Sequence, residues 1–176
     1  MAKLDIITLP DPLLRKTSEP IERVDDELRR LMDDMLETMY EAPGIGLAAV
    51  QVAVPRRVIV MDVTRDDDEE DAEKDPICMV NPEIVTLSDE MRLHEEGCLS
   101  IPEFTAELER SAKSVVRYID RDGLPQEMVC EGLLSTVVQH EIDHTNGILF
   151  IDYLSRLKRD MVIKKFIKAK KTEAVA

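Results

Sequence analysis

The stretch VVQHEIDH, from Val137 to His144, places two histidines four positions apart with a glutamate between them. Apolar residues from Leu133 to about Gly147 recur at helical spacing, and Gly147 suits the end of a helix. In such a helix His140 and His144 lie one above the other on the same face, so both rings can bind one metal ion. Glu141 can then reach a metal-bound water as a general base.

A catalytic metal site of this kind needs a third protein ligand and an open position. The metzincin spacing continues to Gly147, but Phe150 stands where that pattern requires its last histidine. In other endopeptidases the third ligand is a glutamate on a following helix. Here the only candidate is Glu173, which lies in a lysine-rich tail. His94 and Cys98 remain. A cysteine beside a glycine offers the soft thiolate of a Cys/His/His site, so we favour Cys98 and keep His94 as the alternative.

Length and composition suit one domain spanning residues 1–176, with 44% apolar and 34% charged residues. No apolar run approaches a membrane span, and the first residues lack the apolar core of a signal peptide, so we expect no membrane association and a cytoplasmic protein. Three cysteines without an export signal indicate reduced thiols. The net charge of -14 argues against general nucleic-acid binding.

Local patterns predict an α+β fold, in which short, mostly antiparallel strands surround the central helix with the H-E-x-x-H motif and a further helix closes the chain. A regular βαβ alternation is absent. We expect an amphipathic helix at 25–42, strands at 56–63, 77–87 and 114–120, a hairpin turn at 120–123, an acidic loop at about 66–75, and a basic C-terminal helix at about 157–171.

Three short motifs, GIGLAAVQ (Gly44 to Gln51), EGCLS (Glu96 to Ser100) and QHEIDH (Gln139 to His144), resemble the signature motifs of the peptide deformylase family in their order and separations. The similarity extends over most of the chain. It implies removal of the formyl group from the N-terminal formylmethionine of new polypeptides. An H-E-x-x-H metalloendopeptidase is the alternative enzyme, and a structural Cys/His/His site in a peptide-binding module is the non-enzymatic one.

The resemblance also implies roles for individual residues. Glu141 acts as the general acid and base, and the Gln51 amide and the Leu99 backbone N–H stabilise the oxyanion. One divalent metal ion per chain is held by Cys98, His140 and His144. The native ion is implied to be Fe(II), while Zn(II) or Ni(II) suits the isolated protein. The residues implied to bind the peptide and its first side chain are Ile45, Gly46, Gly97, Leu133 and Val137.

Two features bear on partners. Relatives often carry an acidic residue before the first glycine motif and an arginine soon after EGCLSIPE, where this chain has Pro43 and FTAELER, so the rim that faces the peptide is expected to differ. The basic C-terminal helix carries lysines on one side and apolar residues on the other. It either packs on the domain with solvated lysines or docks on the ribosome, as the resemblance implies. We expect a monomer.

Overall fold

The computed structural model describes residues 2–65 and 72–175. Its helices are α1 (Asp26–Glu41), α2 (Leu133–Thr145) and α3 (Arg156–Val175), and four short 3-10 segments are Pro12–Arg15, Ala49–Val52, Val63–Arg65 and Phe150–Tyr153. The strands are β1 (Gly46–Ala48), β2 (Val58–Met61), β3 (Ile77–Leu87), β4 (Met91–Cys98), β5 (Ile101–Ser111), β6 (Lys113–Ile119) and β7 (Pro125–Glu131). Of the predicted acidic loop, residues 66–71 lie outside the described ranges, and 72–75 are neither helix nor strand.

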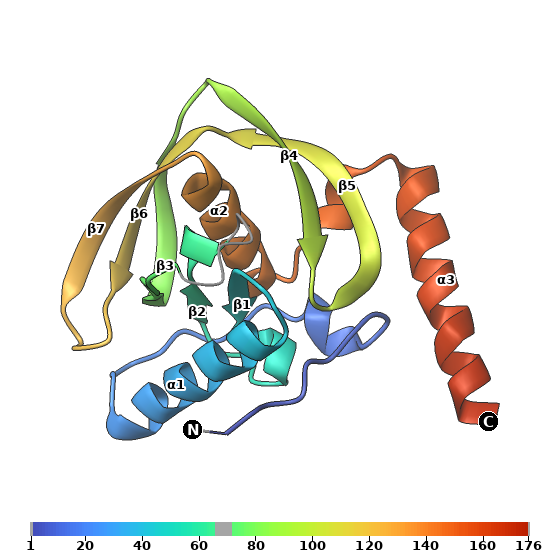
Figure 1. The fold of residues 1–176 in the computed structure, drawn as a ribbon, viewed down its shortest axis with the longest axis horizontal. Coiled ribbons are helices and arrows are strands. Elements are labelled where there is room, and N and C mark those ends of the chain that lie inside the picture. The colour runs from blue at the N-terminus through green and yellow to red at the C-terminus, as the bar shows by residue number, and fades with distance from the viewer. Residues whose placement is uncertain (1, 66–71, 176) are drawn as a thin grey trace.

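The strands form a five-stranded sheet in the order β1-β2-β3-β6-β7 and a separate two-stranded ribbon of β4 and β5. All neighbouring strands in both sheets are antiparallel. Helix α2 lies between the sheet and the ribbon, and α1 packs near the β1 end of the sheet (Figure 1). The α+β prediction, with strands around a central helix, is therefore confirmed.

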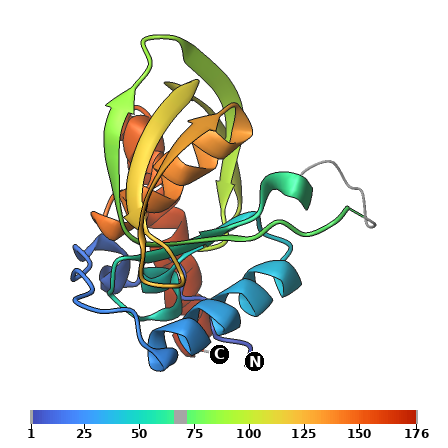
Figure 2. The same ribbon diagram turned by 90° about the vertical axis from the view of Figure 1, so that its left-hand side faces the viewer.

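Helix α1 follows the predicted amphipathic pattern. Asp25 caps its start, because the Asp25 carboxylate accepts a hydrogen bond of 2.9 Å from the backbone N–H of Leu28. The side chains of Leu28, Met32, Met35 and Met39 are fully buried and pack with strand residues of β1 to β3 in one apolar cluster. Replacing one of these methionines by alanine would cost on the order of 2–5 kcal/mol of stability. Figure 2 shows α1, in blue, lying below the strands of the sheet.

The predicted hairpin is formed by β6 and β7. The Asp120 carboxylate accepts hydrogen bonds from the backbone N–H groups of Asp122 and Leu124, at 2.9 and 3.0 Å, and Gly123 takes a φ of +83°. This left-handed conformation is easily adopted only by glycine. The DRDG turn signal therefore correctly predicted the connection between the strands.

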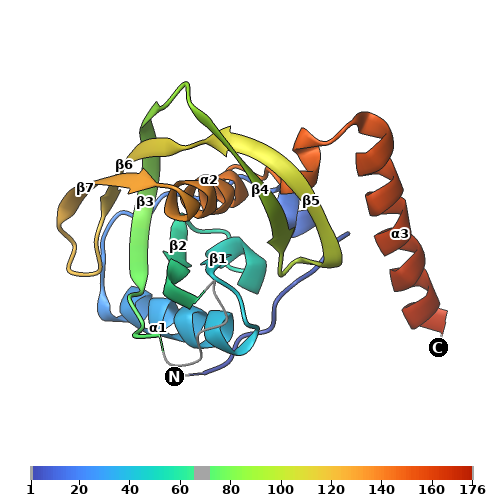
Figure 3. The ribbon, with the colours of Figure 1, turned by 45° about the horizontal axis from the view of Figure 1, so that its top comes forward.

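The β4–β5 ribbon was not predicted, although it arches over α2 and forms one wall of the molecule (Figures 1 and 3). The outward side chains of β4 include the exposed Met91 and Leu93, whereas its inward side chains, Arg92, His94 and Glu96, are polar and more buried. This is the reverse of the pattern that marks a half-buried strand, in which the apolar residues face inward. The sequence therefore carried no strand signal there.

Gly147 ends α2 as predicted. Asn146 is the capping residue, and Gly147 follows it with a φ of +72°, its N–H bonded to the His144 carbonyl at 3.2 Å. A Cβ at this position would overlap with the carbonyl oxygen of Arg15. The close approach fixes the end of α2 against the N-terminal segment.

Helix α3 runs along one side of the molecule (Figure 3). Val162 is buried, and Ile163 and Phe166 pack with it against a cluster that includes Phe150 and Ile101. Most of the helix's lysines are exposed. The predicted apolar face therefore packs on the body of the molecule only in part, through Val162, Ile163 and Phe166, because Ile167 is exposed. In the described ranges, no helix has the length and apolar content needed to cross a membrane.

Candidate active site

Helix α2 places His140 and His144 against Glu96 and Cys98 of β4 and Glu141 against Gly46 of β1, and all three are buried. The rings of His140 and His144 lie 5.0 Å apart, centroid to centroid, as expected for residues four apart on one helical face. Burial lowers the pKa of His144 well below its ordinary value, and His140 adds to this effect. His144 is therefore neutral and has a nitrogen lone pair for a metal.

Cys98 stands at the end of β4, next to an irregularity in the pairing of β4 with β5. Its Sγ lies 3.4 Å from His144 Nε2. One donor atom from each of Cys98, His140 and His144 lies within 4.8 Å of the others, so these three residues could hold a metal ion. No other cluster of this kind occurs in residues 2–65 and 72–175, and His94 is not part of it.

The fit to a metal is supported by the residues behind the cluster. Glu96 Oε1 lies 2.9 Å from His140 Nδ1. An ionised carboxylate only accepts hydrogen bonds, so Nδ1 carries the proton and Nε2 is left to face Cys98 and His144. Burial alone would raise the pKa of Glu96, but the bonds from His140 and Arg110 outweigh it and lower the pKa. Glu96 is thereby kept in the ionised form that orients His140.

Arg110 on β5 holds Glu96 in place through two hydrogen bonds, Nε to Oε2 at 2.6 Å and Nη2 to Oε1 at 3.0 Å. A third bond of 2.9 Å joins Arg110 Nη1 to Asp143 Oδ2, which also accepts from the Tyr153 hydroxyl at 2.8 Å. Sequence reasoning missed this network. Glu96 lay inside a motif, but no local pattern linked it to Arg110, Asp143 and Tyr153.

Glu141 is 4% exposed, and burial raises its pKa to about 7, with His140 and Arg110 acting in the opposite direction. Among the described residues its buried Oε2 has no hydrogen-bond partner. Such an unpartnered carboxylate oxygen is unusual in a protein interior and suits a bound water. The close approach of Gly46 leaves room for this side chain, since a Cβ at Gly46 would lie 2.5 Å from Glu141 Oε1.

Gln51 closes the other side of the cluster. Its Oε1 accepts from the Ala48 backbone N–H at 2.9 Å, so the amide NH₂ points the opposite way. Nε2 lies 3.1 Å from Ser100 Oγ and 3.5 Å from Cys98 Sγ. Gln51 is 1% exposed, which makes its orientation well fixed. Leu99 follows Cys98 in the tight turn between β4 and β5.

A cavity of about 460 Å³ opens beside these residues. Ile45, Gly46, Gly97, Leu99 and Val137 line it, as do Gln51, Cys98, His140 and Glu141. Leu133 does not line it and packs instead among the apolar residues between α2 and the sheet. The residues expected at the site are thus brought together, except Leu133.

Two open strand edges border the cavity. β1 is the last strand of the five-stranded sheet, and β4 pairs only with β5, so among the described strands each has one unpaired edge. Gly46 lies on β1 and Gly97 on β4, and both line the cavity. An extended peptide can add to such an edge through main-chain hydrogen bonds.

Comparisons with known proteins agree with this arrangement. A family model described as Polypeptide deformylase matches residues 3–160. The peptide deformylase of Rhizobium meliloti (strain 1021) is 58% identical over 167 residues, covering 95% of this chain and 94% of the relative. That of Agrobacterium fabrum is 60% identical over 164 residues, covering 93% of this chain and 94% of the relative.

Solved structures give the same result. Peptide deformylase from Ehrlichia chaffeensis in complex with actinonin superposes with a TM-score of 0.88 at 43% identity, over 97% of this chain and 98% of the other. A Met-Ala-Ser-bound class I type b peptide deformylase from Acinetobacter baumannii gives a TM-score of 0.81 at 37% identity, over 87% and 99%. The fold and the matches define a hydrolase. The chain belongs to the peptide deformylase family.

Proposed function

We propose that this hydrolase removes the formyl group from the N-terminal formylmethionine of newly made polypeptides in the cytoplasm. The observation that carries the proposal is Glu141, a buried carboxylate with an unpartnered oxygen beside the Cys98, His140 and His144 cluster, in a chain of this family. The relative bound to Met-Ala-Ser adds support, because a tripeptide that begins with methionine is the product expected from the corresponding formyl-peptide.

A divalent cation held by Cys98, His140 and His144 would supply a nucleophile at neutral pH by lowering the pKa of its bound water. We propose that Glu141 accepts the proton of that water and returns it to the departing amine. A carboxylate whose pKa is about 7 suits both transfers near neutral pH. We propose Fe(II) as the native ion, with Zn(II) or Ni(II) bound in protein isolated in air, because one thiolate and two imidazoles suit all three ions.

Negative charge that develops on the formyl oxygen requires hydrogen-bond donors. Gln51 is suited to this role because the bond from Ala48 N–H fixes its amide with the NH₂ group toward Cys98. We assign the second donor to the backbone N–H of Leu99, the residue directly after Cys98.

We propose that the peptide binds as an extended strand between the open edges of β1 and β4, with main-chain bonds at Ile45, Gly46 and Gly97. The first side chain enters the cavity, where Ile45 and Val137 provide apolar walls. Binding through the main chain accepts many sequences beyond the first residue, which matches a substrate class of diverse nascent chains. Leu133 does not line the cavity, so we assign it only a packing role in support of this wall.

We also propose that the enzyme acts as a monomer near the ribosome. The exposed lysines of α3 are suited to phosphate contacts, while Val162, Ile163 and Phe166 pack on the body. No observation favours the endopeptidase alternative. Phe150, at the position where the metzincin pattern needs a histidine, stacks on His140 with ring centroids 6.0 Å apart.

The deciding experiment compares two substrates. The metal-loaded enzyme is assayed on formyl-Met-Ala-Ser and on a second peptide. The second peptide has a blocked N-terminus without a formyl group, so only its internal peptide bonds can be cleaved. We expect deformylation alone. The Glu141→Gln variant should lose about 10²-fold to 10⁴-fold in kcat and keep its metal. Cys98→Ser should weaken metal binding, and His94→Ala should not. Internal cleavage without deformylation would disprove the proposal.

A further inference from the structure

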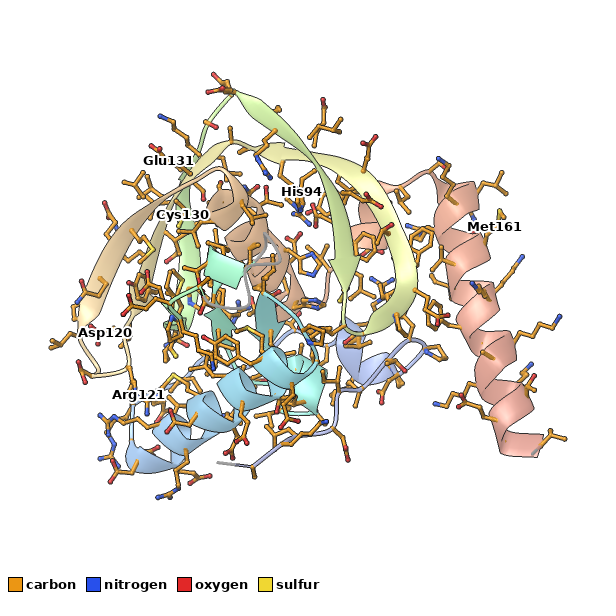
Figure 4. The ribbon with its side chains drawn as sticks, in the orientation of Figure 1. His94, Asp120, Arg121, Cys130, Glu131 and Met161 are labelled. Atoms are coloured by element: carbon orange, nitrogen blue, oxygen red, sulfur yellow. The ribbon has the colours of Figure 1, made fainter. Side chains whose placement is uncertain are left out.

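His94 lies on the inward face of β4, between Arg92 and Glu96. Side chains two apart on a strand point to the same face. The burial of β4 follows this rule, since Leu93 and Glu95 are exposed whereas His94 is half-buried and Glu96 is buried. Figure 4 shows His94 on the side of β4 that faces α2.

The neighbours of His94 fix what it faces on α2. Arg92 Nη1 donates to Thr136 Oγ1 at 3.1 Å, and Glu96 Oε1 lies 2.9 Å from His140 Nδ1. His94, midway between Arg92 and Glu96, therefore lies opposite the helical turn from Thr136 to His140. It lines the same cavity as Val137 of that turn.

Two neighbouring polar residues that line the same cavity, Gln51 and Thr136, have protein partners. Gln51 is bonded to Ala48 and Ser100, and Thr136 accepts from Arg92. Among the described residues, by contrast, no hydrogen bond is made to the His94 ring, and His94 is outside the metal-binding cluster. A neutral imidazole has one N–H donor and one acceptor nitrogen. The His94 ring is thus a half-buried polar group at the cavity, with both nitrogens open to solvent or to a bound ligand.

We propose that His94 is a specificity-determining residue, whose ring N–H donates a hydrogen bond to the sulfur of the substrate's first side chain. The proposal rests on the function proposed above, because it concerns how the same cavity selects methionine. A thioether sulfur is a weak acceptor. Norleucine has the same length but a methylene in place of the sulfur, so it would leave the imidazole N–H without a partner inside the cavity. A site that hydrogen-bonds a substrate group disfavours analogues that lack the group.

Methionine sulfoxide gives a second probe. Its oxygen is a stronger hydrogen-bond acceptor than a thioether, and its larger polarity is unfavourable in a wholly apolar pocket. The His94 ring would reduce this penalty. The pocket therefore distinguishes three side chains of similar length by the acceptor that each one presents at the position of the sulfur.

The test measures kcat/KM of the metal-loaded enzyme on formyl-Met-Ala-Ser and its norleucine and methionine sulfoxide analogues. The parent should prefer methionine over norleucine by about 3-fold to 10-fold, the value of one weak hydrogen bond. His94→Leu should bring this ratio close to one and lower the sulfoxide rate, relative to methionine, by about 10-fold. His94→Gln retains a hydrogen-bond donor, so both kcat/KM ratios should stay close to those of the parent. Leu93→Ala, on the opposite face of β4, is the matched control.

The outcomes are separable. If the parent deformylates none of the three peptides, the proposed function itself is wrong. If deformylation proceeds but both ratios are the same in the parent and in His94→Leu, the assignment of His94 is overturned. An equal loss on all three peptides would indicate a structural role only. If His94→Leu changes the preference for the second substrate residue but not for the first, His94 contacts a different part of the substrate. That result would also overturn the assignment.

Discussion

Gly46 and Glu141 are packed so closely that a Cβ at position 46 would lie 2.5 Å from Glu141 Oε1 and 3.0 Å from Val137 Cγ1. β1 and α2 therefore come together through this glycine, and the space beside it holds the carboxylate that we assign as the proton carrier. Any larger residue at position 46 must displace Glu141 or separate the two elements.

Gly46→Ala should lower kcat by about 10²-fold, because a displacement near 1 Å of a group that acts on the substrate can cost that much. Metal content should stay near that of the parent, since Glu141 is not assigned as a ligand. Steady-state kinetics and metal analysis of the purified variant measure both. Parent-like kcat in Gly46→Ala would show that the carboxylate is not required in its present position.

Glu96→Gln should weaken metal binding by about 10-fold to 100-fold, because His140 loses the carboxylate that fixes its tautomer and orientation. It also leaves Arg110, which is 6% exposed, without its closest charged partner, so the free energy of unfolding should fall as well. Competition with a chelator measures the affinity. Glu95→Gln, its exposed neighbour on β4, is the control and should keep the parent's affinity.

Gln51→Ala should lower kcat by roughly 10²-fold to 10³-fold with a smaller effect on KM, because the amide acts after the carbonyl has become tetrahedral. The substitution also removes the bond to the Ala48 N–H, so thermal unfolding should be recorded in parallel. A raised KM with unchanged kcat would instead assign Gln51 to ground-state binding of the peptide.

Asp62 should contribute to stability in a pH-dependent way. Burial acts to raise its pKa, but hydrogen bonds from Thr64, Tyr40 and the Asp75 N–H outweigh burial and lower it. A lowered pKa in the folded state stabilises the protein above the unfolded value, near pH 4, and this stabilisation is lost as the pH falls through the folded value. Asp62→Asn should therefore be less stable at pH 7 and lose less on acidification. Urea unfolding at several pH values tests this, and parallel profiles would contradict it.

Replacing Lys164, Lys165 and Lys168 by glutamine should weaken ribosome binding and flatten its dependence on salt, because each phosphate contact releases counterions. Activity on a free formyl-peptide should barely change, since the apolar packing of Val162 and Phe166 is retained. Sedimentation with ribosomes at increasing salt is the measurement. Binding that responds neither to salt nor to the substitutions would mean that these lysines are only solvated.

The sequence predicted the parts of the fold whose side chains alternate between water and core. The periodic apolar residues of α1 and α2, the β-branched run of β3 and the Asp120 turn all follow from local chemistry. The β4–β5 ribbon was not predicted, because the residues on the inward face of β4 are polar, namely Arg92, His94 and Glu96. Their burial depends on partners on α2, which are 44 residues away in the pairs Arg92–Thr136 and Glu96–His140. Local pattern carries no information about such pairs.

The candidate site likewise contains residues that the sequence predicted and residues that it did not. His140, Glu141 and His144 were predicted from their spacing, and Cys98 was favoured over His94 from the donor chemistry of a Cys/His/His site, while Gln51 became a candidate through the family resemblance. Arg110 and Asp143 were missed because charged residues on a strand or helix normally indicate solvent, and no local pattern linked Tyr153 to them. Leu133 was expected at the cavity wall, but it does not line the cavity and packs among the apolar residues between α2 and the sheet.

The open edges of β1 and β4 also bear on self-association. An unpaired strand edge can recruit the edge of another molecule, and proteins commonly limit this by keeping such edges short or covered. β1 is only three residues long and is followed at once by a 3-10 turn, and both edges border a cavity rather than a flat surface. A single flexible chain can enter there, whereas the rigid margin of a second folded sheet is kept out. The same confinement that would admit the proposed peptide is therefore expected to limit pairing between the open edges of two molecules.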